Sequence, residues 1–355
     1  MKKMNGINKT TKNNLITYGI VIVAFVIMQT LISTGSVSSL IEGIMVPICI
    51  YVIMAVSLNL VVGILGELSL GHAGFMCVGA FSSAFFSKCM KDVITVDGLR
   101  FFLAMLIGIA VAAVFGILIG IPVLRLKGDY LAIVTLAFGE IIKNLVNVLF
   151  IGKDSNGFHF SLKDVMALDM EPDGTVIVNG PQGITGTPQD STFLIGFIMI
   201  MISLFVILNL INSRDGRAIM AIRDNRIAAE SIGINITKYK LMAFTVSAAL
   251  AGSAGVLYAH NLSALTANTD NFGYNQSIMI LVFVVLGGMG SIRGSVIAAT
   301  VLTLLPELLR GMQDYRMLIY AIVLIVMMLF NWAPKAIEWR ERHLRFGRKQ
   351  KEAVK

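Results

Sequence analysis

Ionisable and hydroxyl side chains inside long apolar stretches are candidates for binding a solute, because the bilayer tolerates few of them without a functional reason. Glu67 and His72 flank Ser69 in a glycine-rich stretch that also contains Gly71. If this stretch leaves the helical conformation, its free backbone N–H groups could receive a carboxylate. The Glu67 carboxylate could then accept hydrogen bonds from an ammonium group. The alternative is that Glu67 and His72 only tie a broken helix together.

A second group of polar residues falls in the apolar stretch that begins at Tyr130. Glu140 lies midway along this stretch, and Lys143 follows one helical turn later. A pair with this spacing neutralises its own charge, which predicts a structural ion pair facing the interior of a helical bundle. Thr135, Glu140 and Asn144 could instead line a pathway for a solute.

The composition indicates which elements position these residues. Of the 355 residues, 56% are apolar and 14% are Asp, Glu, Lys or Arg, and the mean hydropathy is +0.80. A soluble domain carries roughly 25% charged residues. These values predict an all-α polytopic membrane protein and exclude a soluble enzyme, a disulfide-stapled module, a disordered chain and a nucleic-acid-binding fold. Cys49, Cys77 and Cys89 lack metal-ligand spacing, so we expect reduced core residues and no metal site.

Ten stretches are apolar enough to cross a bilayer core, which needs about 20 residues per helix. They are residues 15–33, 40–64, 72–90, 101–122, 130–150, 192–212, 240–260, 276–290, 293–309 and 316–333. With the N-terminus inside, 21 of the 29 Lys and Arg residues lie in inside segments and 8 lie outside. The positive-inside rule therefore places both termini in the cytoplasm. Residues 276–309 could form two spans or one re-entrant pair.

These spans divide the chain into three parts. They are a basic cytoplasmic N-terminus (1–14), a transmembrane domain (15–333) and a basic cytoplasmic tail (334–355). Within the transmembrane domain, residues 151–191 form an extracytoplasmic loop, called here the long loop. Residues 213–239 form a cytoplasmic loop, called here the charged loop.

Glycines interrupt the apolar pattern near both ends of the transmembrane domain. They are Gly63, Gly66, Gly71 and Gly74 in one stretch and Gly287, Gly288, Gly290 and Gly294 in the other. Two glycine-broken segments in corresponding halves of a chain point to a transport pathway near the middle of the bilayer. Close packing between helices would favour the same residues.

The charged loop carries the strongest local pattern. Ile219, Ile222, Arg226 and Ala229 fall on one stripe of a helix, and Gly233 follows as a helix stop. An amphipathic, arginine-rich helix before a glycine turn could dock into a cleft on a soluble partner. It could also lie on anionic lipid head groups, or the segment could be a solvated loop.

The end of the charged loop resembles the coupling loop of ABC importer permeases, whose pattern is Glu-Ala-Ala, three residues and Gly. Ala228, Ala229 and Gly233 match, and Ile227 replaces the glutamate. The arginine-rich segment 216–225 before it resembles the branched-chain amino acid branch. Further stretches are similar to the LivM-type permeases of that branch; they are residues 58–63, 66–75, 125–136, 180–184 and 286–294.

The resemblance implies a permease subunit of an ATP-driven importer for leucine, isoleucine and valine in a bacterial cell membrane. Its partners would be a homologous second permease, two cytoplasmic ATPases and an extracytoplasmic binding protein. In the long loop, the residue types of Thr175–Gly180 predict a short strand followed by a turn. The long loop could dock the binding protein. The chain has no G-x-x-x-x-G-K-[ST] motif, so we expect it to be no enzyme and to bind no cofactor, with ATP used by the partner subunits.

The resemblance also implies roles for individual residues. The expected ATPase-coupling residues are Arg217, Arg223, Asp224, Ala228, Ala229 and Gly233. The expected substrate-pathway residues are Glu67, Ser69, Gly71, His72, Thr135 and Glu140. Two alternatives stay open. One is a urea or short-amide permease of the same family, and the other is an ion-driven secondary amino-acid carrier, for which the chain offers few carboxylates within its spans.

Overall fold

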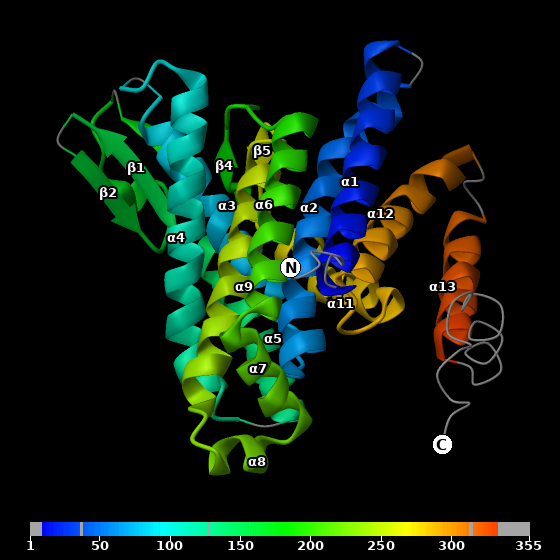
Figure 1. Ribbon diagram of the computed structural model, residues 1–355. Helices are drawn as coiled ribbons and strands as arrows, with labels where there is room; N and C mark the ends of the chain where they lie inside the picture. The colour runs from blue at the N-terminus through cyan, green and yellow to red at the C-terminus, as the bar shows by residue number, and fades with distance from the viewer. Residues whose placement is uncertain are drawn as a thin grey trace, which may run out of the picture. The chain divides into compact units, whose positions relative to one another are not determined.

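Helices form most of the protein in the computed structural model (Figure 1). The structure describes residues 9–35, 38–91, 93–126, 128–155, 157–172, 174–311 and 315–332. Two compact units make up the chain, residues 1–300 and 301–355. The predicted basic tail and most of the predicted basic N-terminus lie outside the described residues.

Each of the ten predicted membrane stretches contains one helix. In the first unit these are α1 (Lys9–Ser33), α2 (Ser39–Asn59), α3 (His72–Cys89), α4 (Asp97–Val123), α5 (Asp129–Asn147), α6 (Phe193–Asn212), α9 (Ile236–Ala259) and α11 (Tyr274–Gly287). The remaining two are α12 (Ile292–Leu308) and α13 (Arg316–Trp332). By length and apolar composition, five described segments qualify as membrane spans: α1, α2 with the turn that follows it, α4, α6 and α9. The chain is therefore a mostly helical, multi-pass membrane protein.

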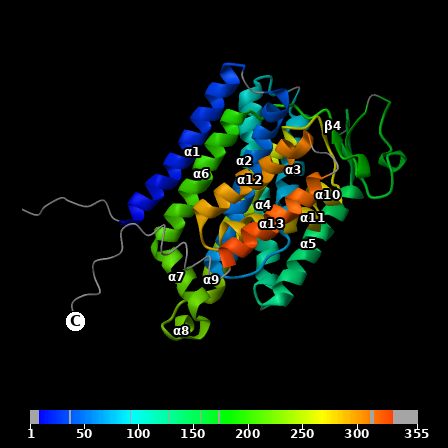
Figure 2. The ribbon, with the colours of Figure 1, turned by 90° about the vertical axis from the view of Figure 1, so that its right-hand side faces the viewer.

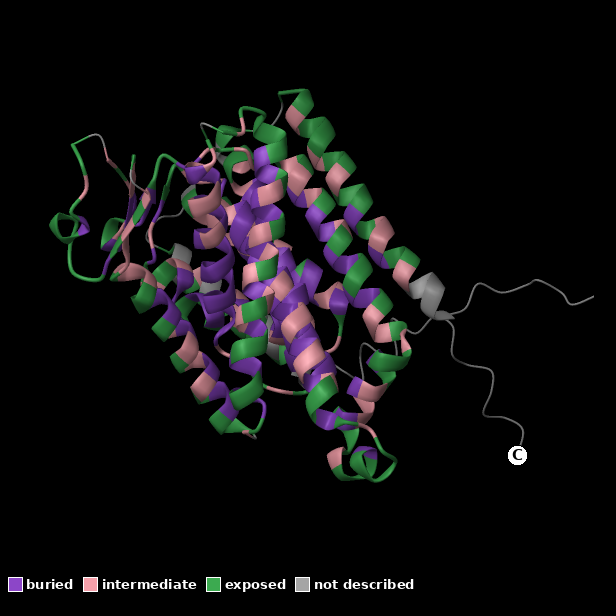
Figure 3. Ribbon diagram, turned by 90° about the vertical axis from the view of Figure 1, so that its left-hand side faces the viewer, coloured by how far each residue is buried: buried purple, intermediate pink, exposed green. Residues whose placement is uncertain are grey.

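Small residues let α9 pack closely in the core of the first unit. α9 contacts α2, α3 and α4, and its Ala248, Ala251, Gly252 and Ala254 are buried. Buried residues gather in the middle of the helical bundle (Figure 3). A Cβ atom on Gly79 of α3 would lie 2.5 Å from the Gly252 Cα atom. Helices in lipid associate through close packing of this kind, because lipid tails are as apolar as the side chains.

Gly79→Val should destabilise the protein, because the added side chain overlaps the backbone of α9. Overpacking of a close-packed core costs about 1–3 kcal/mol, so we expect a lower Tm in detergent. Gly98→Val at the start of α4 is the matched control, since nothing lies within 4 Å of a Cβ atom added there. An equal loss of Tm in both variants would contradict the packing role of Gly79.

Both predicted glycine-rich interruptions are present in the structure. α2 continues into a π-helical turn (Leu60–Leu65) that ends at Gly66, whose φ of 82° lies in the left-handed region. Residues 67–71 are not helical. α11 and α12 are separated by Gly288 and Gly290, with φ of 92° and 81°. α11 has 14 residues and is about 21 Å long, which is shorter than a bilayer core of ~30 Å.

The long loop contains small sheets that an all-α prediction leaves out. β1 (Phe150–Asp154) pairs antiparallel with β2 (Gly157–Ser161) and β3 (Thr175–Asn179), in the order β2-β1-β3. β4 (Ile184–Thr185) pairs with β5 (Ala264–Leu265). β3 and the short 3-10 helix after it confirm the predicted strand and turn. The sequence does not predict β1, because Phe150 continues the apolar run of α5.

Candidate functional site

Thr135 joins the glycine-rich break to the middle of α5. Its hydroxyl accepts a hydrogen bond from the Leu70 N–H at 3.0 Å and donates one to the Ala132 carbonyl at 2.9 Å. Gly71 lies directly against the Thr135 carbonyl, where no side chain would fit. The break between α2 and α3 is therefore held on α5.

The first residues of α3 are held by two other helices. The buried His72 ring contacts the Ser57 hydroxyl of α2, with Nε2 and Oγ 2.7 Å apart. Ala73 donates its N–H to Ser277 Oγ of α11 at 3.1 Å. These contacts support the alternative in which His72 ties the broken helix in place.

Glu140 links α5 to the start of α11, which lies beside it (Figure 2). Its carboxylate pairs with Lys143 at 2.5 Å, which confirms the predicted ion pair, and Lys143 Nζ also donates to Thr269 Oγ1 at 3.1 Å. The Tyr274 N–H donates to the second carboxylate oxygen at 2.8 Å. The first N–H groups of a helix have no partner inside the helix. A carboxylate is favourable at this positive end, so Glu140 caps α11 from a neighbouring helix.

These contacts define one region, called here the polar junction. It consists of residues 69–73, Thr135, Glu140, Lys143, Thr269, Tyr274 and Ser277. Ser69 Oγ is buried there without a hydrogen-bond partner among the described residues. Buried polar atoms normally have partners, so this hydroxyl retains capacity to bind a polar group. Nowhere among the residues that the structure describes do three His, Cys, Asp or Glu side chains lie together as possible metal ligands.

Glu140 lies in the second half of α5. The helix begins at Asp129, and Glu140 lies about 16 Å further along it at 1.5 Å per residue. Transporters with broken helices bind their substrates near the middle of the bilayer, with helix N-termini facing the anionic group.

Glu67 is bound elsewhere, to Lys240 of α9. The two side chains form an ion pair and are 15% and 4% exposed. The sequence predicts a helix from residue 240, but α9 begins at Ile236, so Lys240 is a buried helical residue rather than the edge of the charged loop. Lys240 already binds the Glu67 carboxylate. This contact supports the alternative in which Glu67 ties the broken helix in place, and it does not support Glu67 as an acceptor for an ammonium group of the solute.

The charged loop forms two helices rather than the single one that the stripe predicts. α7 (Arg214–Asp224) stops at Asn225, whose Oδ1 accepts the Ala228 N–H at 3.1 Å and caps α8 (Arg226–Ser231). Asn is a favoured residue at this cap position, and it outweighs the continuous helical stripe. Gly233 has a φ of 85° and follows α8, as the predicted helix stop requires.

The apolar residues of the charged loop face two ways. Ala229 is buried with Ile222 and Ile236, so this expected coupling residue packs inside the loop. Ile227 and Ile232 are 80% and 75% exposed. They lie on and beside α8, at the end of the bundle opposite the strands of the long loop (Figures 1 and 2).

Arg217 and Arg223, which the resemblance implies are coupling residues, form hydrogen bonds within the chain. Arg217 Nη1 donates to the Asn212 carbonyl at 3.2 Å. Arg223 pairs with Asp224 at 2.9 Å, and its Nη1 donates to the Gly63 carbonyl at 3.1 Å. Arg223 and Gly63 are 160 residues apart, so no local pattern in the sequence predicts their contact.

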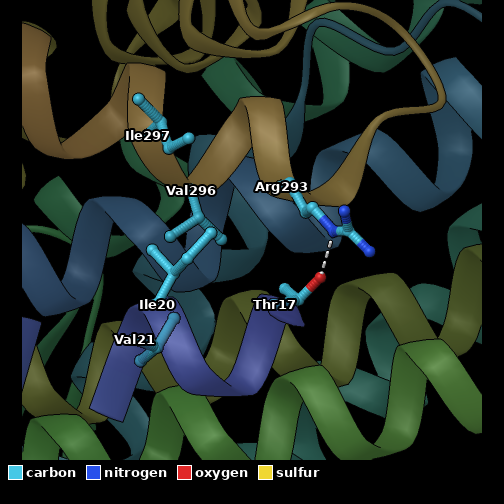
Figure 4. A pocket seen from close by; sticks show the side chains of 6 residues that line it. All are labelled: Thr17, Ile20, Val21, Arg293, Val296 and Ile297. Carbon is cyan, nitrogen blue, oxygen red and sulfur yellow. Dashed lines mark hydrogen bonds between the residues drawn. The ribbon is translucent and has the colours of Figure 1, made fainter. Parts of the chain in front are cut away.

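A small pocket between α1 and the start of α12 contains none of the predicted pathway residues (Figure 4). It is lined by Thr17, Ile20, Val21, Arg293, Val296 and Ile297. The Arg293 Nε–H donates to Thr17 Oγ1 at 2.6 Å. The other lining residues are aliphatic, so this pocket offers little to recognise a polar solute.

A multi-pass helical bundle with two glycine-broken segments and polar side chains beside one of them is typical of membrane transport proteins, the class to which permeases belong. A family model described as "Branched-chain amino acid transport system / permease component" matches residues 40–330. The chain belongs to this family.

The individual relatives that the chain resembles are also named as permease proteins. LivM, the permease protein of the high-affinity branched-chain amino acid transport system of Salmonella typhimurium, is 35% identical over 337 residues, which cover 92% of this chain and 75% of the relative. The Escherichia coli protein of the same name is 37% identical over 298 residues, 81% of this chain and 67% of the relative. The fructose import permease protein FruG of Bifidobacterium longum is 25% identical over 254 residues, 68% and 69% of the two chains. No solved structure matches the chain.

Proposed function

We propose that the chain is the permease subunit of an ATP-driven importer for leucine, isoleucine and valine in a bacterial inner membrane. Family membership and two relatives named for branched-chain amino acid transport support this substrate class. A homologous second permease completes the pathway. Two cytoplasmic ATPases supply the energy, and an extracytoplasmic binding protein delivers the amino acid.

In this proposal ten helices cross the membrane and both termini are cytoplasmic. Support comes from the excess of Lys and Arg in the predicted inside segments. The charged loop and the strands of the long loop also lie at opposite ends of the bundle (Figures 1 and 2). The long loop would face the binding protein and the charged loop the ATPases.

The observation that carries the coupling role is the exposed apolar surface of α8. Ile227 and Ile232 are largely exposed, and Ala228 between them is exposed as well. Apolar groups presented together on a polar loop mark an interaction site. Arg226 and Glu230 border this surface, which suits a cleft on a soluble ATPase. When ATP closes the two ATPases, α7 and α8 would move with them as a rigid body.

The polar junction would form this chain's part of the pathway. Ser69 Oγ, which has no hydrogen-bond partner among the described residues, would face the carboxylate of the passing amino acid. Gly71 and Thr135 would keep the break open beside α5, and His72 would hold the end of α3. Glu140 already binds Lys143 and the Tyr274 N–H, so it would hold the start of α11 in place beside the pathway.

Reconstitution tests this function. The chain is assembled in proteoliposomes with the second permease, the two ATPases and the binding protein, and uptake of labelled leucine, valine and urea is measured with and without ATP. We expect ATP-dependent uptake of leucine and valine. Uptake of urea instead would support the short-amide alternative. Uptake by the chain without ATPases would contradict the proposal in favour of an ion-driven carrier.

A further inference from the structure

Two side chains, one before and one after α8, bind the segment that follows α2. Arg223, in the last turn of α7, donates to the Gly63 carbonyl in the π-helical turn at 3.1 Å. Lys240, in the second turn of α9, forms the ion pair with Glu67. α7 and α9 are the helices before and after α8. The surface proposed to dock on the ATPase is therefore connected to the segment Gly63–Glu67 at two points.

The contact with Arg223 has a clear chemical reason. The last carbonyls of a helix lack partners inside it, and a cation is favourable at this negative end. Arg223 Nε and Nη2 are held by Asp224 at 3.0 and 2.9 Å, which orients the guanidinium and leaves Nη1 for Gly63. A Cβ atom on Gly66 would lie 2.6 Å from Arg223 Cγ. Glycine at this position therefore lets the arginine side chain lie against the break.

The same segment contacts the second glycine-rich break on its other side. A Cβ atom on Gly63 would lie 2.8 Å from the Gly290 Cα atom, so the two backbones touch. Asn59 Oδ1 accepts the Gly290 N–H at 2.8 Å, and Asn59 Nδ2 donates to Ser295 Oγ at 2.7 Å. A displacement of Gly63 would therefore also displace Gly290, in the loop between α11 and α12. π-helical turns occur frequently at functional sites.

We propose that Arg223 and Lys240 are positioning residues that transmit the movement of α7 and α8 to the two glycine-rich breaks, rather than residues that bind the ATPase. The proposal rests on the proposed function, since it assumes an ATPase on α8. The buried ion pair between Lys240 and Glu67 resists separation. Arg223 adds a second connection to the carbonyl of a turn that can rearrange. Together they form a rigid link between the motor and the pathway.

The test uses the full importer in proteoliposomes, with amino-acid uptake, ATP hydrolysis and copurification of the ATPases measured on each preparation. The variants are Arg223→Gln and Lys240→Gln. We expect the ATPases to stay bound and to hydrolyse ATP while uptake per ATP hydrolysed falls about tenfold, a typical size for coupling between two sites. Arg214→Gln on α7 and Lys238→Gln on α9 remove the same charges at exposed positions and should keep the wild-type ratio.

A third variant guards against a simple folding defect. Glu67→Lys combined with Lys240→Glu reverses the ion pair, and we expect it to restore uptake per ATP above that of Lys240→Gln. An unchanged ratio in Arg223→Gln and Lys240→Gln would overturn the proposal, as would loss of the ATPases or a parallel fall of uptake and hydrolysis. Failure of the proposed function is distinguishable, because the wild-type importer would then show no ATP-dependent uptake.

Discussion

Ile227→Asp should release the ATPases from the importer and reduce uptake on the order of 100-fold, because a buried apolar anchor at an interface contributes about 2–4 kcal/mol. Ile227 is 80% exposed in the isolated chain and contributes nothing to its core. The variant should therefore insert and fold normally. Copurification of tagged permease with the ATPases measures the release directly, and Tm in detergent measures the fold.

The control for this variant is another exposed apolar residue at the other end of the bundle. Leu162 follows β2 in the long loop and is 64% exposed. Leu162→Asp adds the same charge and should keep the ATPases bound. Retention of the ATPases by Ile227→Asp would show that α8 does not dock them, whereas their loss in both variants would point to general misassembly.

The helices of this fold are predictable because their signal is local. The apolar stretches are long enough that composition alone locates a helix in each of them, even where the helix is as short as α11. The glycine-rich breaks are equally visible, since Gly66 and Gly290 take left-handed backbone conformations that other residues avoid. The pair of Glu140 and Lys143 is predictable for the same reason, because one helical turn separates the two residues.

The contacts that make these elements into a site are not local. Glu140 caps a helix that begins 134 residues later, and Arg223 donates to the Gly63 carbonyl 160 residues earlier. A single sequence contains no pattern that connects such positions. Lys240 shows the same limit, since a lysine beside an apolar run suggests the edge of a span, and only the buried Glu67 carboxylate explains its place inside α9.

The second large effect is expected from Glu140→Ala, which removes one member of a buried ion pair. Lys143 is 8% exposed and would keep only Thr269 Oγ1 as a partner, while α11 would lose its cap. Breaking a buried pair in this way costs about 3–5 kcal/mol, a large share of a typical stability of 5–15 kcal/mol. We expect a markedly lower Tm and no measurable uptake.

The double variant Glu140→Ala/Lys143→Met separates stability from transport. Replacing both members of a buried pair by apolar residues is often neutral, so Tm should recover much of the loss. Uptake should stay low, because the carboxylate is still missing from the start of α11.

Glu307→Ala is the matched control for the charge change. Glu307 forms a pair with Arg310 at the same spacing, and Arg310 is 54% exposed. Exposed pairs contribute about 0–1 kcal/mol, so this variant should change Tm little. Recovery of uptake together with Tm in the double variant would show that Glu140 only stabilises the bundle and that its cap on α11 has no role in the pathway.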